Sequence, residues 1–256
     1  MQLKMWVGAG ATLAMLLLSG CVPMTKVKDV LADKQAYMDA NFSPDKLARE
    51  VAQTITAADQ KPLGFHSMVV HLDWQLNDDD KNKTVSIKQA ASFRNVGGSL
   101  VQMQVEDSRN GVPMTQNYQL SYRGIVALKS QSLNVGAAMT GFAFELKSFQ
   151  HFDAVGRPGT SGMLDYQYKS GTTAQIMNFR DGRSTCKIGP DYPAAKINAE
   201  LAGDARDLDC TVYNANGVKT SSSRAAYLAK YGVAIVLHTE HAAGISDAKV
   251  TAVEIE

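Results

Sequence analysis

The chain contains few of the residues that mark the commoner functional classes of protein. Of its 256 residues, only three are cysteines and two are tryptophans. Neither sign of charge is in excess, because 26 Lys and Arg residues face 25 Asp and Glu residues. A protein that binds nucleic acid needs a concentrated basic face to neutralise phosphates. The charge balance therefore disfavours a nucleic-acid partner.

Recognisable catalytic and metal-binding signatures are missing as well. The chain has no Gly-x-Ser-x-Gly elbow, no phosphate loop of the Gly-x-x-x-x-Gly-Lys type and no His-Glu-x-x-His pair. His238 and His241 are three positions apart on an apparent strand, so they point to opposite faces and could not bind one metal together. The same holds for His66 and His71, which are five positions apart. Asp residues 78–80 lack the alternate spacing and central Gly of a calcium loop. We therefore expect no catalytic, cofactor or metal site, and we predict that the protein is not an enzyme.

The first twenty residues have the organisation of an export signal. Lys4 is followed by an almost uncharged apolar run from Met5 to Leu18, which is too short to span a bilayer comfortably. The run ends in Leu-Ser-Gly-Cys at positions 18–21, which resembles the lipobox of bacterial lipoproteins. This resemblance implies that the signal is cut before Cys21 and that the Cys21 thiol carries a diacylglyceryl group. The alternative is a secreted protein in which Cys21 only happens to follow the signal.

The lipobox resemblance also implies a location. Two or more acyl chains anchor a protein stably, since each buried methylene contributes about 0.8 kcal/mol. Val22 stands where an Asp would resemble the inner-membrane retention signal of enteric bacteria. We therefore expect the protein to be held to the outer membrane through acyl chains on Cys21 and to face the periplasm.

Two cysteines remain once Cys21 is assigned to lipid. Cys186 and Cys210 are an even pair in an exported chain, which favours a disulfide. A bridge closing a loop of this length contributes roughly 3 kcal/mol in the chain-entropy account. The alternatives are a metal site or two free thiols, but no further ligands lie at the spacing of a zinc site.

The hydrophobic periodicity changes once along the chain. Apolar residues recur at helical spacing over 26–40 and 44–58, with Ser43-Pro44 as a helix start. From residue 65 the pattern alternates between apolar and polar, which indicates strands with one buried face. Some ten such segments follow, with Asn110-Gly111 as a hairpin turn and the run 174–179 as a late apolar segment. The stretch 218–232 fits either a short helix or a strand.

These elements predict an α+β protein in which N-terminal helices precede a large antiparallel meander sheet. We expect the sheet to form a half-barrel or a barrel wrapped on the helix at 44–58. The expected division is a signal peptide at 1–20, a tether at 21–25 and one domain at 26–256. This layout resembles the curved-sheet periplasmic lipoproteins and lipid carriers of the LolA/LolB type, in architecture rather than in any matching motif.

Three functions compete at this stage, in order of preference. The first is a non-catalytic binding or accessory protein that engages another component of the cell envelope. The second is a carrier of a lipid-like ligand, which predicts an enclosed apolar cavity of roughly 300 Å³ or more. An enzyme comes third. Aromatic residues on the predicted inner faces suit core packing first and a ligand lining second: Trp74, Phe93, Tyr118, Tyr122, Phe144, Tyr166 and Tyr168.

Overall fold

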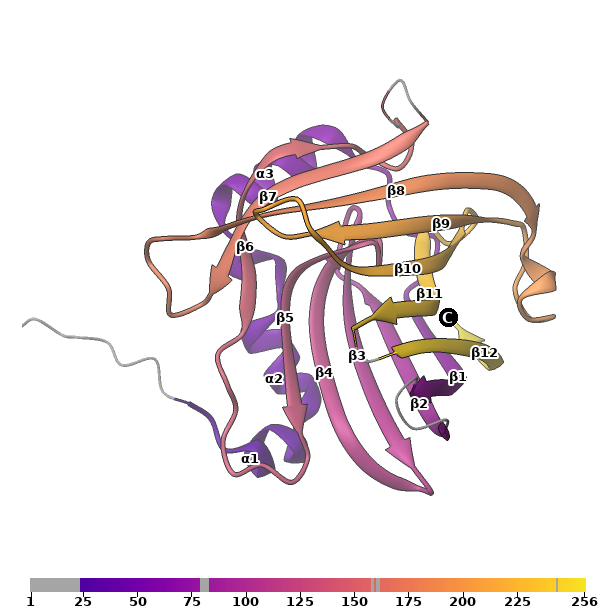
Figure 1. The fold of residues 1–256 in the computed structure, drawn as a ribbon, viewed down its shortest axis with the longest axis horizontal. Helices are drawn as coiled ribbons and strands as arrows, with labels where there is room; N and C mark the ends of the chain where they lie inside the picture. The colour runs from indigo at the N-terminus through magenta and orange to yellow at the C-terminus, as the bar shows by residue number, and fades with distance from the viewer. Residues whose placement is uncertain (1–23, 79–82, 158, 160–161, 243) are drawn as a thin grey trace, which may run out of the picture.

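Twelve strands and three short helices make up the part of the chain that the structure describes (Figure 1). This computed structural model describes residues 24–256 apart from 79–82, 158, 160–161 and 243, so the predicted signal peptide and Cys21 lie outside the described residues. The helices are α1 (Val27–Ala32), α2 (Lys34–Asn41) and α3 (Arg49–Ala58). The strands are β1 (Ser67–Asp78), β2 (Lys83–Asn95), β3 (Leu100–Arg109), β4 (Val112–Tyr122), β5 (Val126–Asn134), β6 (Phe144–Phe152), β7 (Met163–Thr172), β8 (Arg180–Pro193), β9 (Asp204–Tyr213), β10 (Lys219–Leu228), β11 (Val233–His241) and β12 (Gly244–Ile255).

The strands form a closed barrel. Each strand pairs antiparallel with its neighbours in sequence, and β1 pairs with β12 to complete the ring. The predicted antiparallel meander is therefore confirmed, and of the two expected shapes the barrel is the observed one. Closure pairs β1 with β12, the two strands that an open meander would leave as its edges. Within the described residues, no helix has the length and apolar character needed to cross a bilayer.

The alternation that predicted β1 corresponds to one buried face. Met68, Val70, Leu72 and Trp74 are all buried in one apolar cluster, which also contains Phe93 of β2. The helix predicted at 44–58 contributes to a second cluster. There Val51 and Ile55 of α3 pack with apolar side chains from several strands of the barrel: Leu146, Leu164, Tyr166, Leu208 and Tyr227. The barrel is thus packed around apolar side chains that include those of a helix.

The N-terminal helices lie where β5 and β6 separate (Figure 1). These two strands share only the pairs Lys129–Glu145 and Ser130–Phe144, whereas β1 and β2 pair along nearly their whole length. The loop between β5 and β6 contacts the start of the described chain, since Thr140 N donates to Thr25 O at 2.8 Å. Val30, Met38 and Phe42 then pack on one face of β4 and β5, against Tyr118, Leu120 and Leu133.

The helices are shorter and more divided than the periodicity predicts. The predicted helix at 26–40 is broken at Asp33, whose carboxylate accepts the Ala36 N–H at 2.9 Å and so starts α2. The predicted helix at 44–58 begins as a 3-10 turn over Pro44–Lys46, and α3 starts only at Arg49. The Ser43 hydroxyl donates to the Asp45 carboxylate instead of capping a backbone N–H.

The structure corrects one strand prediction and decides one segment that the sequence left open. The run 174–179 is a loop between β7 and β8, and β7 continues through Ser170 and Gly171, although a Ser-Gly pair is typical of a turn. The Gln175 side chain forms this loop, because its amide donates to Met177 O and Asn178 O at 2.9 and 2.7 Å. The ambiguous stretch 218–232 contains strand β10 and no helix.

Candidate functional site

A buried ion pair joins the turn between β4 and β5 to the end of α3. Arg123 donates from Nε to Asp59 Oδ2 at 2.6 Å and from Nη2 to Asp59 Oδ1 at 2.9 Å. The side chains of the two residues are only 1% and 8% exposed. Arg123 Nη1 also donates to Gly232 O at 3.0 Å, and Nη2 donates to Lys61 O. One guanidinium thus fixes three segments that are far apart in sequence.

The local backbone places Arg123 in an unusual conformation. Arg123 and Gly124 have φ values of +50° and +70°, which suits the two central positions of the β-turn that Ile125 N closes by donating to Tyr122 O at 2.8 Å. A positive φ is uncommon for a residue with a Cβ atom. The turn is held from both sides, since Arg123 N donates to Ser99 O at 3.0 Å and Ala234 N donates to Arg123 O at 2.8 Å. Contacts with distant strands therefore maintain the conformation.

The charges of the pair are reinforced by their surroundings. Burial acts to raise the pKa of Asp59, but hydrogen bonds from Arg123 and from the Tyr122 hydroxyl outweigh it and hold that pKa below its ordinary value. Burial acts to lower the pKa of Arg123, and Asp59 reverses the shift so that the pKa is raised. Asp59 is therefore a carboxylate at neutral pH, and its two oxygens are engaged by the protein.

A cleft of about 610 Å³ opens beside this pair. Its lining contains the cationic side chains Lys61, Arg123, Arg157 and Arg206 but only one carboxylate, that of Asp59. Arg206 also pairs with Asp191 at 2.8 Å, and among the described residues no ion pair of Lys61 or Arg157 is found. Positive charge in a partly enclosed space favours an anionic ligand, because the low-dielectric walls focus the field.

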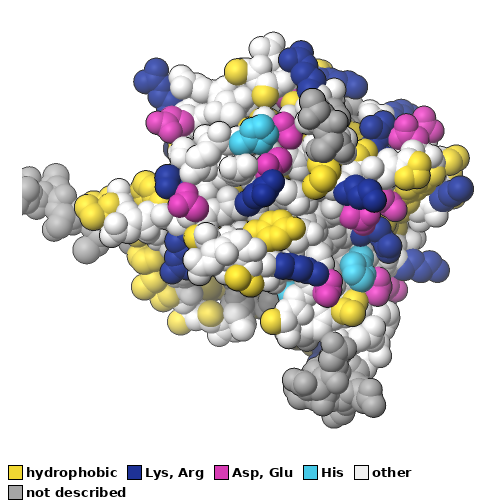
Figure 2. Space-filling view, turned by 45° about the horizontal axis from the view of Figure 1, so that its top comes forward, with side chains coloured by type: hydrophobic (Ala, Val, Ile, Leu, Met, Phe, Trp, Pro, Cys, Tyr) yellow, Lys and Arg dark blue, Asp and Glu magenta, His cyan; other side chains and the backbone are white. Residues whose placement is uncertain are grey.

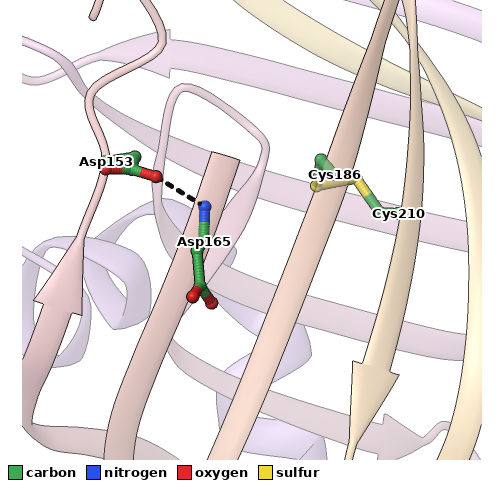
Figure 3. Close-up of a disulfide and its surroundings, with 4 residues drawn as sticks. All are labelled: Asp153, Asp165, Cys186 and Cys210. Atoms are coloured by element: carbon green, nitrogen blue, oxygen red, sulfur yellow. Dashed lines mark hydrogen bonds between the residues drawn. A yellow bond between two sulfur atoms is a disulfide. The ribbon is translucent and has the colours of Figure 1, made fainter. Parts of the chain in front are cut away.

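The wall formed by 154–157 is fixed by hydrogen bonds to neighbouring strands. The Asp153 carboxylate accepts the Asp165 backbone N–H at 2.9 Å (Figure 3), and Val155 N donates to the Tyr122 hydroxyl at 2.9 Å. Asp165 is itself held by Arg183, which donates to its two carboxylate oxygens at 2.8 and 2.9 Å. Because Tyr122 also contacts Asp59, the wall of the cleft and the ion pair form one network.

The predicted disulfide is present. Cys186 of β8 and Cys210 of β9 lie directly opposite each other, with their Cα atoms 4.0 Å apart and their sulfur atoms bonded (Figure 3). Both side chains are buried in the same apolar cluster as Val51 and Ile55. The bridge therefore joins two adjacent barrel strands within the core.

The histidines are dispersed over the barrel. His238 Nδ1 lies 2.7 Å from Asp247 Oδ1, whereas His241 Nδ1 lies 3.0 Å from Gly244 O. His151 Nε2 lies 3.1 Å from Asp153 Oδ1, and His151 is not among the residues that line the cleft. Among the described residues, no three His, Cys, Asp or Glu side chains are grouped so that they could hold a metal ion. Cys21, the predicted lipidation site, lies outside the described residues.

A second recess lies among the barrel strands β1, β2, β3, β11 and β12. It has a volume of about 250 Å³ and combines apolar and polar side chains, namely Trp74, Leu76, Ile87, Gln89, Asp107, Thr239 and Ser246. Pockets for drug-sized ligands hold roughly 300 Å³ or more. This recess is therefore small for a lipid-like ligand.

The sequence interpretation missed both members of the ion pair. The link Arg123-Gly124 between two apolar runs carried a usable signal, because a two-residue hairpin turn requires positive φ and an Arg there is unusual. Asp59 carried no such signal. It follows a helix like many surface residues, and its partner lies 64 positions away.

The comparisons with known proteins give a similar solved structure but no family. No family model matches it. No curated protein matches it either. Among solved structures, it is similar to a β-barrel-like protein of a domain of unknown function, DUF1849, from Brucella abortus. The alignment covers 76% of this chain and 99% of that one, with 8% sequence identity and a TM-score of 0.44.

Proposed function

We propose that this protein is a lipid-anchored, non-catalytic binding protein of the bacterial cell envelope, and that the cleft beside Arg123 holds an anionic group of its ligand or partner. The observation that carries the proposal is the charge of the cleft. Of the four cationic side chains that line it, Arg123 is paired with Asp59 and Arg206 with Asp191, and the positive charge of Lys61 and Arg157 is in excess over the carboxylates of the lining. Arginine and lysine at such a site suit phosphate or carboxylate groups.

The chemistry of the lining supports binding rather than catalysis. Among the described residues that line the cleft there is no His, Ser or Cys. General acid–base catalysis works best with a pKa near the operating pH. The pKa of Asp59 is held low by Arg123 and Tyr122, and burial raises the pKa of Tyr122, so neither group exchanges protons readily at neutral pH.

The envelope location rests on the N-terminal sequence. The lipobox-like segment ending at Cys21 implies acylation there, and Val22 favours the outer membrane with the barrel in the periplasm. The bridge between Cys186 and Cys210 suits that compartment, because disulfides persist in oxidising environments. The carrier function that competed at the level of sequence receives less support, since the recess near Trp74 is small and partly polar.

The cleft is tested by thermal unfolding of the mature acylated protein in detergent, with pyrophosphate and citrate as probes. A ligand that binds the native state stabilises it in proportion to the logarithm of its concentration. The double variant Lys61→Gln, Arg157→Gln should bind at least about tenfold more weakly, because each charge-assisted hydrogen bond contributes roughly 1.5–3 kcal/mol.

The matched control is Lys28→Gln, Arg109→Gln, which removes two positive charges from exposed positions outside the cleft lining. This control should retain the stabilisation seen with the unchanged protein. Equal loss in both double variants would show that only net charge matters. In that case, the cleft would have no special role.

A further inference from the structure

Exposed apolar side chains gather around the point where the described chain begins. The anchor-side patch consists of Met24, Met139, Phe142, Phe144, Ile176 and Met177. Ile176 is 83% exposed and Met177 is 62% exposed, although both are large apolar residues. Single exposed apolar residues are normal on soluble proteins, whereas a contiguous group marks an interaction surface.

The members of the patch belong to three segments that contact one another. Thr140 N donates to Thr25 O, and Lys26 bridges to Met139, so the β5–β6 loop lies beside the start of the chain. Thr173 N donates to Ala143 O at 2.8 Å, which places the β7–β8 loop next to the same segment. Both loops and the start of the chain lie at the left of Figure 1, and Figure 2 shows hydrophobic side chains gathered at that end.

The chain outside the described residues indicates what covers this patch. If Cys21 is acylated, as the proposed function assumes, only three peptide units separate its acyl chains from Met24. Because consecutive Cα atoms are 3.8 Å apart, the Cα atoms of Cys21 and Met24 are at most about 11 Å apart in any conformation. The membrane surface therefore lies within reach of the patch, and interfacial apolar groups enter it by about 5–10 Å.

We propose that the anchor-side patch rests on the lipid surface and inserts Ile176 and Met177 at the boundary between headgroups and acyl chains. Contact at the patch as well as at the anchor would fix the orientation of the barrel. Strand β8 leads away from the patch over fourteen residues, a path of about 46 Å at about 3.3 Å per residue, and ends at the 3-10 turn over Ala194–Lys196. In Figure 1 this turn lies at the right, opposite the start of the chain.

The test uses the mature acylated protein reconstituted into phosphatidylethanolamine–phosphatidylglycerol vesicles with and without brominated acyl chains. Bromine quenches indole fluorescence only at short range, so Ile176→Trp reports insertion. Ala195→Trp is the matched control, because Ala195 is exposed in the distant 3-10 turn. The one other tryptophan of the mature chain, Trp74, is buried and contributes equally to both proteins.

We expect brominated lipid to quench the indole of Ile176→Trp by about half, as suits an interfacial depth of 5–10 Å, and to leave Ala195→Trp unchanged. Mass analysis of the same samples separates the two levels of the proposal. An unmodified residue 21 would overturn the anchor and with it the proposed function. An acylated protein in which both indoles respond equally, or in which Ile176→Trp is shielded by a co-purifying protein, would overturn the membrane-facing patch alone.

Discussion

The guanidinium of Arg123 and the carboxylate of Asp59 form a two-pronged ion pair that is almost completely removed from solvent, at 1% and 8% exposure. The pair connects the end of α3 with two turns. Arg123 itself lies in the turn between β4 and β5, and it donates to Gly232 O in the turn between β10 and β11. Since Tyr122 joins the same carboxylate and Val155, the pair also supports one wall of the cleft.

Removing one member of the pair should destabilise the fold strongly. Asp59→Ala leaves a buried guanidinium without its counter-charge, which costs about 3–5 kcal/mol of unfolding free energy. Arg183→Gln provides the comparison, because its partner Asp165 forms a similar pair at the surface and such pairs contribute about 0–1 kcal/mol. Urea unfolding measures both. Similar losses in the two variants would contradict the structural role of the buried pair.

The same pair predicts a dependence of stability on pH. The folded-state pKa of Asp59 is lowered, so its stabilising contribution is complete above the unfolded pKa near 3.9 and is lost as the pH falls through the folded value. Unfolding free energy measured in urea should therefore fall steeply below about pH 4. Asp59→Asn should be less stable at neutral pH but should lose less on acidification. If the unfolding free energy of Asp59→Asn fell with pH as steeply as that of the unchanged protein, Asp59 would not be the source of the acid dependence.

Two glycines with similar backbones allow a test of the turn at Arg123. Gly124 and Gly111 have φ values of +70° and +76°, so a side chain at either position is strained. A Cβ at Gly124 would lie 2.5 Å from Ala234 O, whereas nothing lies within 4 Å of one at Gly111. Gly111→Ala should lower the unfolding free energy by about 1–2 kcal/mol. Gly124→Ala should lower it clearly more. Comparable unfolding midpoints for the two variants would mean that the β4–β5 turn can move away from β11 without a loss of stability.

Reduction of the disulfide should weaken the barrel. The Cys186→Ser, Cys210→Ser double variant should lose roughly 3 kcal/mol of unfolding free energy, mainly because the unfolded chain gains freedom. In the unchanged protein a thiol reagent should label neither cysteine before reduction and both after unfolding with reductant. A non-reducing digest should yield a peptide pair joined through these residues. Labelling without reduction would argue against a bridge in the native protein.

Membrane attachment should depend on Cys21. The Cys21→Ser variant lacks the thiol to which a diacylglyceryl group is added, so it should appear in the soluble fraction after cell lysis and ultracentrifugation. The unchanged protein should sediment with membranes and be released by detergent. Membrane sedimentation of the variant at the level of the unchanged protein would count against the lipid anchor.

Local pattern alone was enough to predict most of the strands. Met68, Val70 and Leu72 are buried because one face of β1 packs on the core. Side chains alternate between the two faces of any strand, so this pattern does not depend on which strand β1 pairs with. The same logic failed at 174–179, where an apolar run is exposed in a loop, and left β10 ambiguous because its first half is polar. The pairing of Cys186 with Cys210 followed from counting cysteines in an exported chain.

Closure, the cleft and the anchor-side patch were decided only by the tertiary structure. Whether β1 meets β12 depends on the twist summed over every intervening strand, which no local window contains. Asp59 and Arg123 likewise acquire their roles from segments 64 residues apart, and Phe144 lies opposite Thr172, close in sequence to Ile176, only because β6 pairs with β7. Periodicity reports which side of an element is buried; long-range contacts determine what it is buried against.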